Sequence, residues 1–323
     1  MTATLRAGVV GTGHLGSLHA RKYQALNGVE LAAVADVDPE RARQAAGDDT
    51  TPVFSDHRAL AEKVDLASVV VPTGLHYEVA RDLLNAGVHV LVEKPVTTTL
   101  DEARALIELA EQKNLVLQVG HLERFNPAVQ ALAEYGGEPL FIESHRIAPF
   151  NPRGTDVNVI LDLMIHDIDL IQQLVKSPLE EIRANGVPVL TDNTDIANAR
   201  LAFANGCVAN VTASRVSQKS QRSMRIFQRD TYFLVDMGEH KLQIRRRGSG
   251  ESWPGVPDIE SEDRELERGD ALLAEIESFV DSVQNNREPV VTGTDGLRAL
   301  EAASEITRLL EDNAPAKPGA PTE

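Results

Sequence analysis

The feature that most constrains this chain is a glycine-rich turn directly after its first apolar run. Residues 5–10 are typical of a buried strand, and they are followed at once by Gly11-Thr12-Gly13-His14-Leu15-Gly16. In such a turn the first glycine permits a tight bend, the second lets a pyrophosphate approach the backbone, and the third lets a helix pack on the sheet. A helix starting near His14 would direct unpaired N–H groups and a partial positive charge at that pyrophosphate. The pattern predicts a dinucleotide-binding site.

An acidic residue indicates which dinucleotide is bound. Asp36 ends a second apolar run over 30–35, about 20 residues beyond the glycine-rich turn. A carboxylate there accepts hydrogen bonds from a ribose 2′-hydroxyl and repels a 2′-phosphate. We therefore predict NAD as the cofactor, with Asp38 adding a second negative charge. Arg41 is the one nearby group that could tolerate a phosphate, and we interpret it as a solvated residue of a helix over 39–46.

The first third of the chain alternates strand and helix patterns. Further apolar runs at 67–71, 88–92 and 115–119 are typical of buried parallel strands. Helical patterns lie between them at 76–86 and 100–113, the latter with Thr99 and Glu102 as a capping box. This alternation predicts a doubly wound parallel sheet of the Rossmann type, hence an α/β domain at the N-terminus.

After about Gly120 the pattern changes. One helical segment over 157–175 precedes longer alternating runs, which predict antiparallel strands. Asn205-Gly206 between two such runs is a strong hairpin signal, and Arg229-Asp230 and Gly238-Glu239 indicate further reversals. We predict a C-terminal α+β region with an open, mostly antiparallel sheet and helices on one face. Residues 248–263, rich in glycine, proline and acid, suggest a mobile loop, whereas 270–285 and 295–312 are amphipathic helices.

Composition excludes several classes of function. A formal net charge of −17 disfavours a nucleic-acid partner, because a polyanion would be repelled. No apolar stretch is long enough to span a bilayer, and residues 1–6 lack the regions of a signal peptide, so we expect a cytoplasmic protein without a membrane partner. The single cysteine, Cys207, permits no internal disulfide and no zinc cluster, and we expect a buried structural thiol. We expect no metal site.

Polar residues follow three strands of the predicted sheet. They are Pro72-Thr73, Glu93-Lys94-Pro95 and Gly120-His121. Ligands of parallel sheets bind beyond the carboxyl ends of the strands, so Glu93 and Lys94 are expected to face the crevice where the nicotinamide would lie. A lysine beside a positively charged nicotinamide gives up its proton readily, which suits proton exchange near neutral pH. A surface ion pair is the alternative interpretation.

A second group of polar residues lies in the predicted helix over 157–175. Asp162 and His166 stand four residues apart and so share a helix face. The carboxylate could orient the imidazole, leaving His166 as general base for a substrate hydroxyl. A surface contact and a metal half-site are the alternatives. The other histidines, among them His19, are expected to have structural roles.

These motifs together resemble the family of glucose-fructose oxidoreductase, inositol dehydrogenase and MocA-like dehydrogenases. The resemblance rests on the glycine-rich turn, the Glu93-Lys94-Pro95 tripeptide, Asp162 four residues before His166, and the expected open sheet. It implies that Lys94 and His166 handle the hydroxyl proton while Asp162 positions them. It also implies a cis peptide before Pro95, subunit contacts through the open sheet, and a nicotinamide ribose lined by Thr73, His76 and Glu93. Many relatives carry a glycine-rich stretch where this chain has residues 156–161.

Within that family, residues 121–127 (His-Leu-Glu-Arg-Phe-Asn-Pro) resemble dehydrogenases that oxidise the 3-hydroxyl of UDP-N-acetylglucosamine. Arg124 could give paired donors to a phosphate or sugar oxygen, and Asn126 could contact a hydroxyl. Arg146, Arg153 and Arg215 are further candidates for a diphosphate, and the sequence does not select among them.

The resulting prediction is an NAD-dependent dehydrogenase that oxidises a secondary sugar hydroxyl of a nucleotide sugar. A free-sugar or inositol dehydrogenase of the same family is the first alternative, and a non-catalytic NAD-binding sensor is the second. The expected domains are an NAD-binding domain over 1–120, a substrate-binding and oligomerisation domain over 121–312, and a disordered tail over 313–323. A homodimer or homotetramer is expected.

Overall fold

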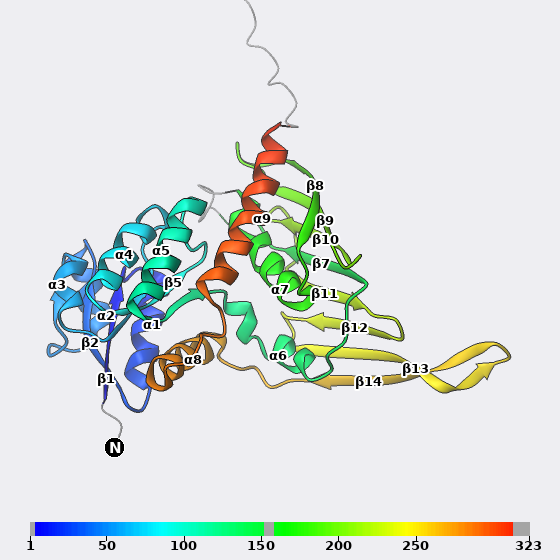
Figure 1. Ribbon diagram of the computed structural model, residues 1–323, viewed down its shortest axis with the longest axis horizontal. Coiled ribbons are helices and arrows are strands. Elements are labelled where there is room, and N and C mark those ends of the chain that lie inside the picture. The colour runs from blue at the N-terminus through cyan, green and yellow to red at the C-terminus, as the bar shows by residue number, and fades with distance from the viewer. Residues whose placement is uncertain (1–3, 152–157, 313–323) are drawn as a thin grey trace, which may run out of the picture. The chain divides into compact units, whose positions relative to one another are not determined.

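A computed structural model describes residues 4–151 and 158–312 of the chain. Within them the chain forms two compact units (Figure 1). One unit combines the chain up to Phe125 with Asp270–Leu300, and the other combines Asn126–Gly269 with the chain from Glu301. The expected tail over 313–323 lies outside the described residues.

The first unit is built on a parallel six-stranded sheet of order β3-β2-β1-β4-β5-β6. The strand order reverses between β1 and β4, and doubly wound sheets bind dinucleotides beyond the carboxyl ends of the strands at that point. The predicted α/β fold is confirmed. The strands are β1 (Leu5–Val10), β2 (Val29–Ala35), β3 (Val53–Phe54), β4 (Leu66–Val69), β5 (His89–Glu93) and β6 (Leu117–Gly120).

Helices cover both faces of this sheet. Ala7 and Val9 of β1 share a core with α1, α2 and α8, whereas a side chain at Gly8 would meet Leu60 of α3. Because neighbouring residues of a strand point to opposite faces, α3 lies on the other face. The helices are α1 (His14–Ala25), α2 (Pro39–Ala46), α3 (His57–Ala61), α4 (His76–Asn85), α5 (Leu100–Lys113) and α8 (Ala271–Asn285). The capping box of Thr99 and Glu102 starts α5 as predicted.

Helix α8 belongs to the first unit although it comes late in the chain. It packs against α1 (Figure 1). Its residues Leu272, Ile276 and Phe279 are buried in the core that contains Tyr23 of α1. The predicted boundary at residue 121 assigns this helix to the second domain, over 121–312. Helical periodicity shows that one face of α8 is buried but not which sheet covers it, so the return of the chain is visible only in the structure.

The second unit contains an eight-stranded sheet of order β14-β13-β12-β11-β7-β10-β9-β8. Only the pair β7 and β10 is parallel, which agrees with the predicted mostly antiparallel sheet. The strands are β7 (Phe141–Ile147), β8 (Leu179–Val187), β9 (Ile196–Phe203), β10 (Val208–Ser214), β11 (Gln221–Phe227), β12 (Thr231–Asp236), β13 (Lys241–Trp253) and β14 (Val256–Glu265). The three predicted reversals all occur, and Gly206 in the first has φ 86°.

One face of this sheet packs against helices. Along β7, Ile142, Ser144 and Arg146 are buried, and the residues between them face the other side. Helix α7 (Ile165–Val175) packs on β7 and β10, and α6 (Pro127–Ala133) on β12 and β13. Helix α9 (Gly293–Asp312) ends in this unit. Cys207 is buried beside β10, and burial raises the pKa of its thiol to about 11, as expected for a structural thiol.

The prediction of a mobile loop over 248–263 was wrong. These residues form most of the long hairpin of β13 and β14, which extends from the sheet (Figure 1). The outer part of the hairpin is exposed on both faces, so its sequence has no apolar alternation. Trp253 and Ile259 there are 74% and 70% exposed. Among the described residues, no helix combines the length and apolarity needed to cross a bilayer.

Candidate active site

The glycine-rich turn between β1 and α1 has the geometry that a dinucleotide requires. Gly11 has φ 87°, and a side chain there would lie 2.6 Å from the main-chain oxygen of Val70. A Cβ at Gly16 would overlap the main-chain oxygen of Gly11, whereas one at Gly13 would meet nothing within 4 Å. The turn is therefore closed on the protein side at Gly11 and Gly16 and open at Gly13. That open side, at the N-terminus of α1, fits a bound pyrophosphate.

Asp36 follows the last residue of β2 and contacts this turn. Its Oδ2 accepts hydrogen bonds from the main-chain N–H and the hydroxyl of Thr12, at 2.6 and 3.0 Å. Its Oδ1 accepts the N–H of Asp38, which in turn caps α2. The carboxylate is therefore fixed beside the glycine turn, where NAD places its adenosine ribose in sheets of this type. Arg41 pairs with Asp38 at 3.2 Å and is exposed, as interpreted from the sequence.

The loops after β4 and β5 are joined by a buried histidine. A short 3₁₀ turn, η1 (Thr73–Leu75), follows Pro72 and leads into α4. The ring nitrogens of His76 lie 2.9 Å from the main-chain oxygens of Val71 and Pro95. Burial lowers the pKa of His76, although the two carbonyl oxygens favour its protonated form. His76 thus ties the two loops together, and the peptide between Lys94 and Pro95 is cis, as the family resemblance implied.

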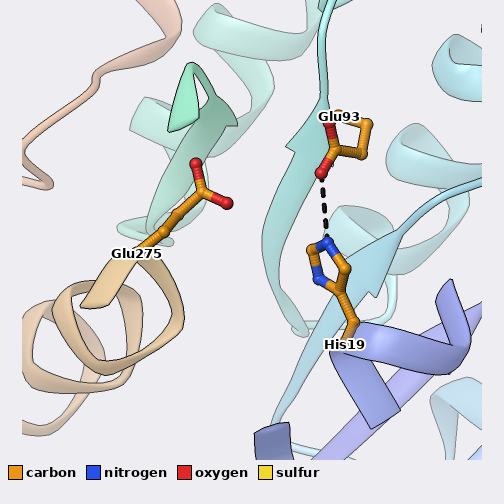
Figure 2. A group of neighbouring side chains, drawn as sticks. All are labelled: His19, Glu93 and Glu275. Atoms are coloured by element: carbon orange, nitrogen blue, oxygen red, sulfur yellow. Dashed lines mark hydrogen bonds and ion pairs between the residues drawn. The ribbon is translucent and has the colours of Figure 1, made fainter. Parts of the chain in front are cut away.

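Glu93, the last residue of β5, is surrounded by three elements of the first unit (Figure 2). Its Oε1 lies 3.1 Å from Nε2 of His19 on α1, and its Oε2 accepts the N–H of Lys94 at 3.3 Å. A side chain at Gly120 of β6 would lie 3.0 Å from this carboxylate, so the glycine makes room for it. The third neighbour is Glu275 of α8, whose carboxylate lies close to both Glu93 and His19. Sequence reasoning missed Glu275, although an acid on the apolar face formed by Leu272, Ile276 and Phe279 was a signal.

Asp162 and His166 lie in the second unit, on a distorted helix. The expected helix over 157–175 is a π-helical turn, η3 (Ile160–Met164), that continues into α7. Asn158 caps the turn by accepting the N–H of Leu161 at 3.0 Å, and its amide donates to Thr307 of α9. Both Asp162 and His166 are half-buried. π-helical turns recur at functional sites, and this one carries the predicted acid Asp162, whereas the predicted base His166 lies in the first turn of α7. Residues 156 and 157 of the atypical stretch lie outside the described residues.

Arg124 and Asn126 occupy well-packed positions. Arg124 is buried in the 3₁₀ turn η2 (Leu122–Phe125), 3.8 Å from the carboxylate of Asp295. Burial acts to raise the pKa of Asp295, but hydrogen bonds from Thr292 and the charge of Arg124 outweigh it and lower the pKa. Asn126 caps α6 through Ala128, and its amide donates to the main-chain oxygen of Met237 at 3.0 Å. Their predicted contacts with substrate stay predictions.

The other arginines proposed for a diphosphate have structural partners. Arg146 binds Asp167 at 2.9 and 3.1 Å, and Arg215 binds Asp195 at 2.8 Å. Each of these side chains is at least 94% buried. A guanidinium that already neutralises a buried carboxylate has fewer N–H donors left for a phosphate, and contacts of Arg146 and Arg215 with a diphosphate stay predictions. Arg153 lies outside the described residues.

Comparison with known proteins decides the family. The profile of the oxidoreductase family with an NAD-binding Rossmann fold matches residues 5–121, and that of the GFO/IDH/MocA C-terminal domain matches residues 135–233. The chain belongs to the GFO/IDH/MocA oxidoreductase family. It is therefore an NAD-binding dehydrogenase, and the resemblance drawn from the sequence is confirmed.

Individual relatives cover nearly the whole chain. UDP-N-acetylglucosamine 3-dehydrogenase of Acidithiobacillus ferrooxidans is 43% identical over 95% of this chain and 97% of its own length. A solved structure of that enzyme has a TM-score of 0.90, covering 95% of this chain and 98% of its own. The NAD-dependent scyllo-inositol 2-dehydrogenase of Bacillus subtilis is 25% identical over 98% of this chain and 96% of its own length. A scyllo-inositol dehydrogenase of Lactobacillus casei with bound NAD(H) shares the fold, with a TM-score of 0.81.

Proposed function

We propose that this enzyme oxidises the C3 hydroxyl of UDP-N-acetylglucosamine to the 3-keto sugar with NAD as oxidant. The observation that carries the proposal is the 43% identity to UDP-N-acetylglucosamine 3-dehydrogenase over 95% of the chain. The segment over 121–127, singled out in the sequence for the same resemblance, supports it. NAD supplies the nicotinamide carbon C4 that accepts the hydride.

The proposed chemistry uses one residue of the first unit and two of the second. His166 takes the proton of the substrate hydroxyl as general base, and Asp162 orients its imidazole. The ammonium of Lys94, directly after β5, stabilises the developing alkoxide. Either His166 or Lys94 can also return the proton when the reaction runs in reverse.

The remaining predicted contacts divide between cofactor and substrate. The turn Gly11-Thr12-Gly13-His14-Leu15-Gly16 holds the pyrophosphate and Asp36 holds the adenosine ribose. Thr73, His76 and Glu93 line the nicotinamide ribose, with His76 acting by fixing the loops after β4 and β5. Pro72 and Lys94 also contact the cofactor. Arg124 and Asn126 contact the nucleotide sugar.

Substrate specificity can be tested by calorimetric titration of the NAD-bound enzyme with UDP, free N-acetylglucosamine and inositol. UDP is expected to bind to the NAD-bound enzyme. Binding of inositol without binding of UDP would favour the alternative of an inositol dehydrogenase, which the Bacillus subtilis relative represents.

Catalysis is tested by the ultraviolet absorbance of NADH during incubation with UDP-N-acetylglucosamine. The Lys94→Ala and His166→Ala variants are expected to lose activity while still binding NAD. Lys113→Ala is the matched control, because Lys113 is an exposed lysine of α5. Binding of NAD without NADH formation from UDP-N-acetylglucosamine would contradict the proposed substrate. The cytoplasmic location and the homodimer or homotetramer expected from the sequence belong to the same proposal, and sedimentation analysis measures the subunit number.

A further inference from the structure

Three ionisable side chains converge inside the first unit, behind the end of β5 (Figure 2). They are His19 of α1, Glu93 of β5 and Glu275 of α8, and one side-chain N or O atom of each lies within 4.8 Å of the other two. His19 and Glu275 are fully buried, and Glu93 exposes 13% of its side chain. Two carboxylates and an imidazole enclosed at this distance need a proton or a cation to balance their charge.

Glu275 is the member of this cluster without donors. Among the residues that the structure describes, none hydrogen-bonds to either oxygen of its carboxylate. Gln118 of β6 donates only to its main-chain oxygen, at 3.1 Å. Burial, and then the charge of Glu93, raise the pKa of Glu275 well above its ordinary value. The carboxyl group therefore retains a proton and needs an acceptor for it.

A chain of hydrogen bonds indicates where the other protons of the cluster lie. The hydroxyl of buried Tyr23 lies 2.8 Å from Oγ of Ser68, which lies 3.0 Å from Nδ1 of His19. Burial raises the pKa of Tyr23, so the phenol stays a donor. If Tyr23 donates to Ser68 and Ser68 to His19, then Nε2 of His19 carries the imidazole proton and donates it to Glu93. This arrangement leaves no lone pair on His19 for a metal ion.

We propose that Glu275 is a positioning residue that keeps a proton in the native enzyme and donates it to the carboxylate of Glu93. Glu93 is then held by His19, by the N–H of Lys94 and by Glu275, each from a different segment of the first unit. Among the described residues, the titratable groups near Glu275 are Tyr23 and His19 from α1 and Glu93 from β5, and Gln118 of β6 donates to its main-chain oxygen. Loss of the proton would place two anions side by side and displace Glu93 together with the start of the Lys94 loop.

The consequence for the cofactor rests on the proposed place of Glu93 at the nicotinamide ribose. With Glu275 protonated, Glu93 keeps its position and NAD binds normally. As pH rises and Glu275 ionises, NAD affinity falls. Glu275→Gln removes this pH dependence because glutamine can donate to Glu93 but cannot ionise.

Infrared difference spectroscopy of the whole enzyme tests the proton directly. The spectrum of wild type minus Glu275→Gln is expected to contain the carbonyl band of a protonated carboxyl group at neutral pH. Glu277→Gln is the control, since Glu277 is an exposed acid of the same helix, and its difference spectrum should lack that band. Ionised-carboxylate bands for Glu275 would overturn the proposal. So would a stoichiometric zinc or manganese ion in the purified enzyme that Glu275→Gln loses, because a cation would then replace the proton.

NAD binding, measured by calorimetry without any sugar, tests the positioning role. Glu275→Gln should bind NAD as the wild type does at neutral pH and better than it at alkaline pH. Glu275→Leu, which cannot donate, should bind about tenfold more weakly, as expected for a lost hydrogen bond to a charged group. Wild-type NAD affinity in a folded Glu275→Leu variant would refute the positioning role. If that variant fails to fold, the infrared measurement on Glu275→Gln still tests the proposal. Neither readout depends on the sugar, so failure of the proposed substrate leaves both intact.

Discussion

The two glycines that frame the start of α1 should respond in opposite ways to the same added methyl group. In Gly13→Ala the new Cβ meets nothing within 4 Å, and the backbone there, at φ −62° and ψ −160°, is open to alanine. We therefore expect a change in unfolding free energy within about 1 kcal/mol. In Gly16→Ala the Cβ overlaps the main-chain oxygen of Gly11, and main chain cannot rotate away as a side chain can. Overpacking of this kind costs about 3 kcal/mol.

The two variants should consequently separate stability from cofactor binding. Gly13→Ala places a methyl group where the pyrophosphate approaches, which costs one charge-assisted hydrogen bond. That loss, about 1.5–3 kcal/mol, weakens the binding of NAD about 10- to 100-fold. Gly16→Ala lowers the melting temperature of the apoenzyme by roughly 6–12 °C. Calorimetric titration with NAD and thermal unfolding followed by circular dichroism measure the two effects. Undiminished NAD affinity in Gly13→Ala would refute the placement of the pyrophosphate.

Three further predictions concern charged groups. Asp36→Asn should weaken the binding of NAD and strengthen the binding of NADP, because it removes the anion that repels a 2′-phosphate. An unchanged ratio of the two dissociation constants would contradict the assignment of Asp36 to the adenosine ribose. Arg215→Leu should destabilise the protein by about 3–5 kcal/mol in urea unfolding, since Asp195 is left buried and unpaired; a loss below about 1 kcal/mol would show that the pair is dispensable. Burial acts to raise the pKa of Asp195, but hydrogen bonds from the N–H groups of Leu190 and Val189 and from Arg215 outweigh it and lower the pKa. The stability from this group is therefore present above about pH 4 and lost as pH falls further, so the advantage of wild type over Asp195→Asn should shrink on acidification. An advantage that is constant from pH 7 to the acid limit would contradict the predicted shift.

Local patterns predicted the parts of the fold that have one buried face. The helices over 39–46 and 100–113 occur with the expected bounds, because caps and apolar spacing define them within one segment. The hairpin of β13 and β14 was missed for the opposite reason, since a strand exposed on both faces has no alternation. The π-helical turn η3 also has no signature in residue spacing.

The candidate site was predictable where residues close together in the sequence determine the arrangement of the side chains. The turn from Gly11 to Gly16 and the acid at Asp36 needed only their neighbours in sequence, and the structure puts them in contact. Contacts between distant segments could not be read from the chain: Glu275 reaches Glu93 only because α8 returns to the first unit. The same limit applies to Arg146 and Arg215, whose buried partners lie about 20 residues away.

The proposed reaction transfers a hydride from C3 of a UDP-linked sugar to NAD. Incubation of the enzyme with UDP-N-acetylglucosamine that carries deuterium at C3, followed by mass spectrometry of the NADH, tests this transfer. The NADH is expected to be heavier by one deuterium, and substrate deuterated at C4 instead is expected to give unlabelled NADH. Deuterium that stays in the sugar product while NADH forms would contradict it.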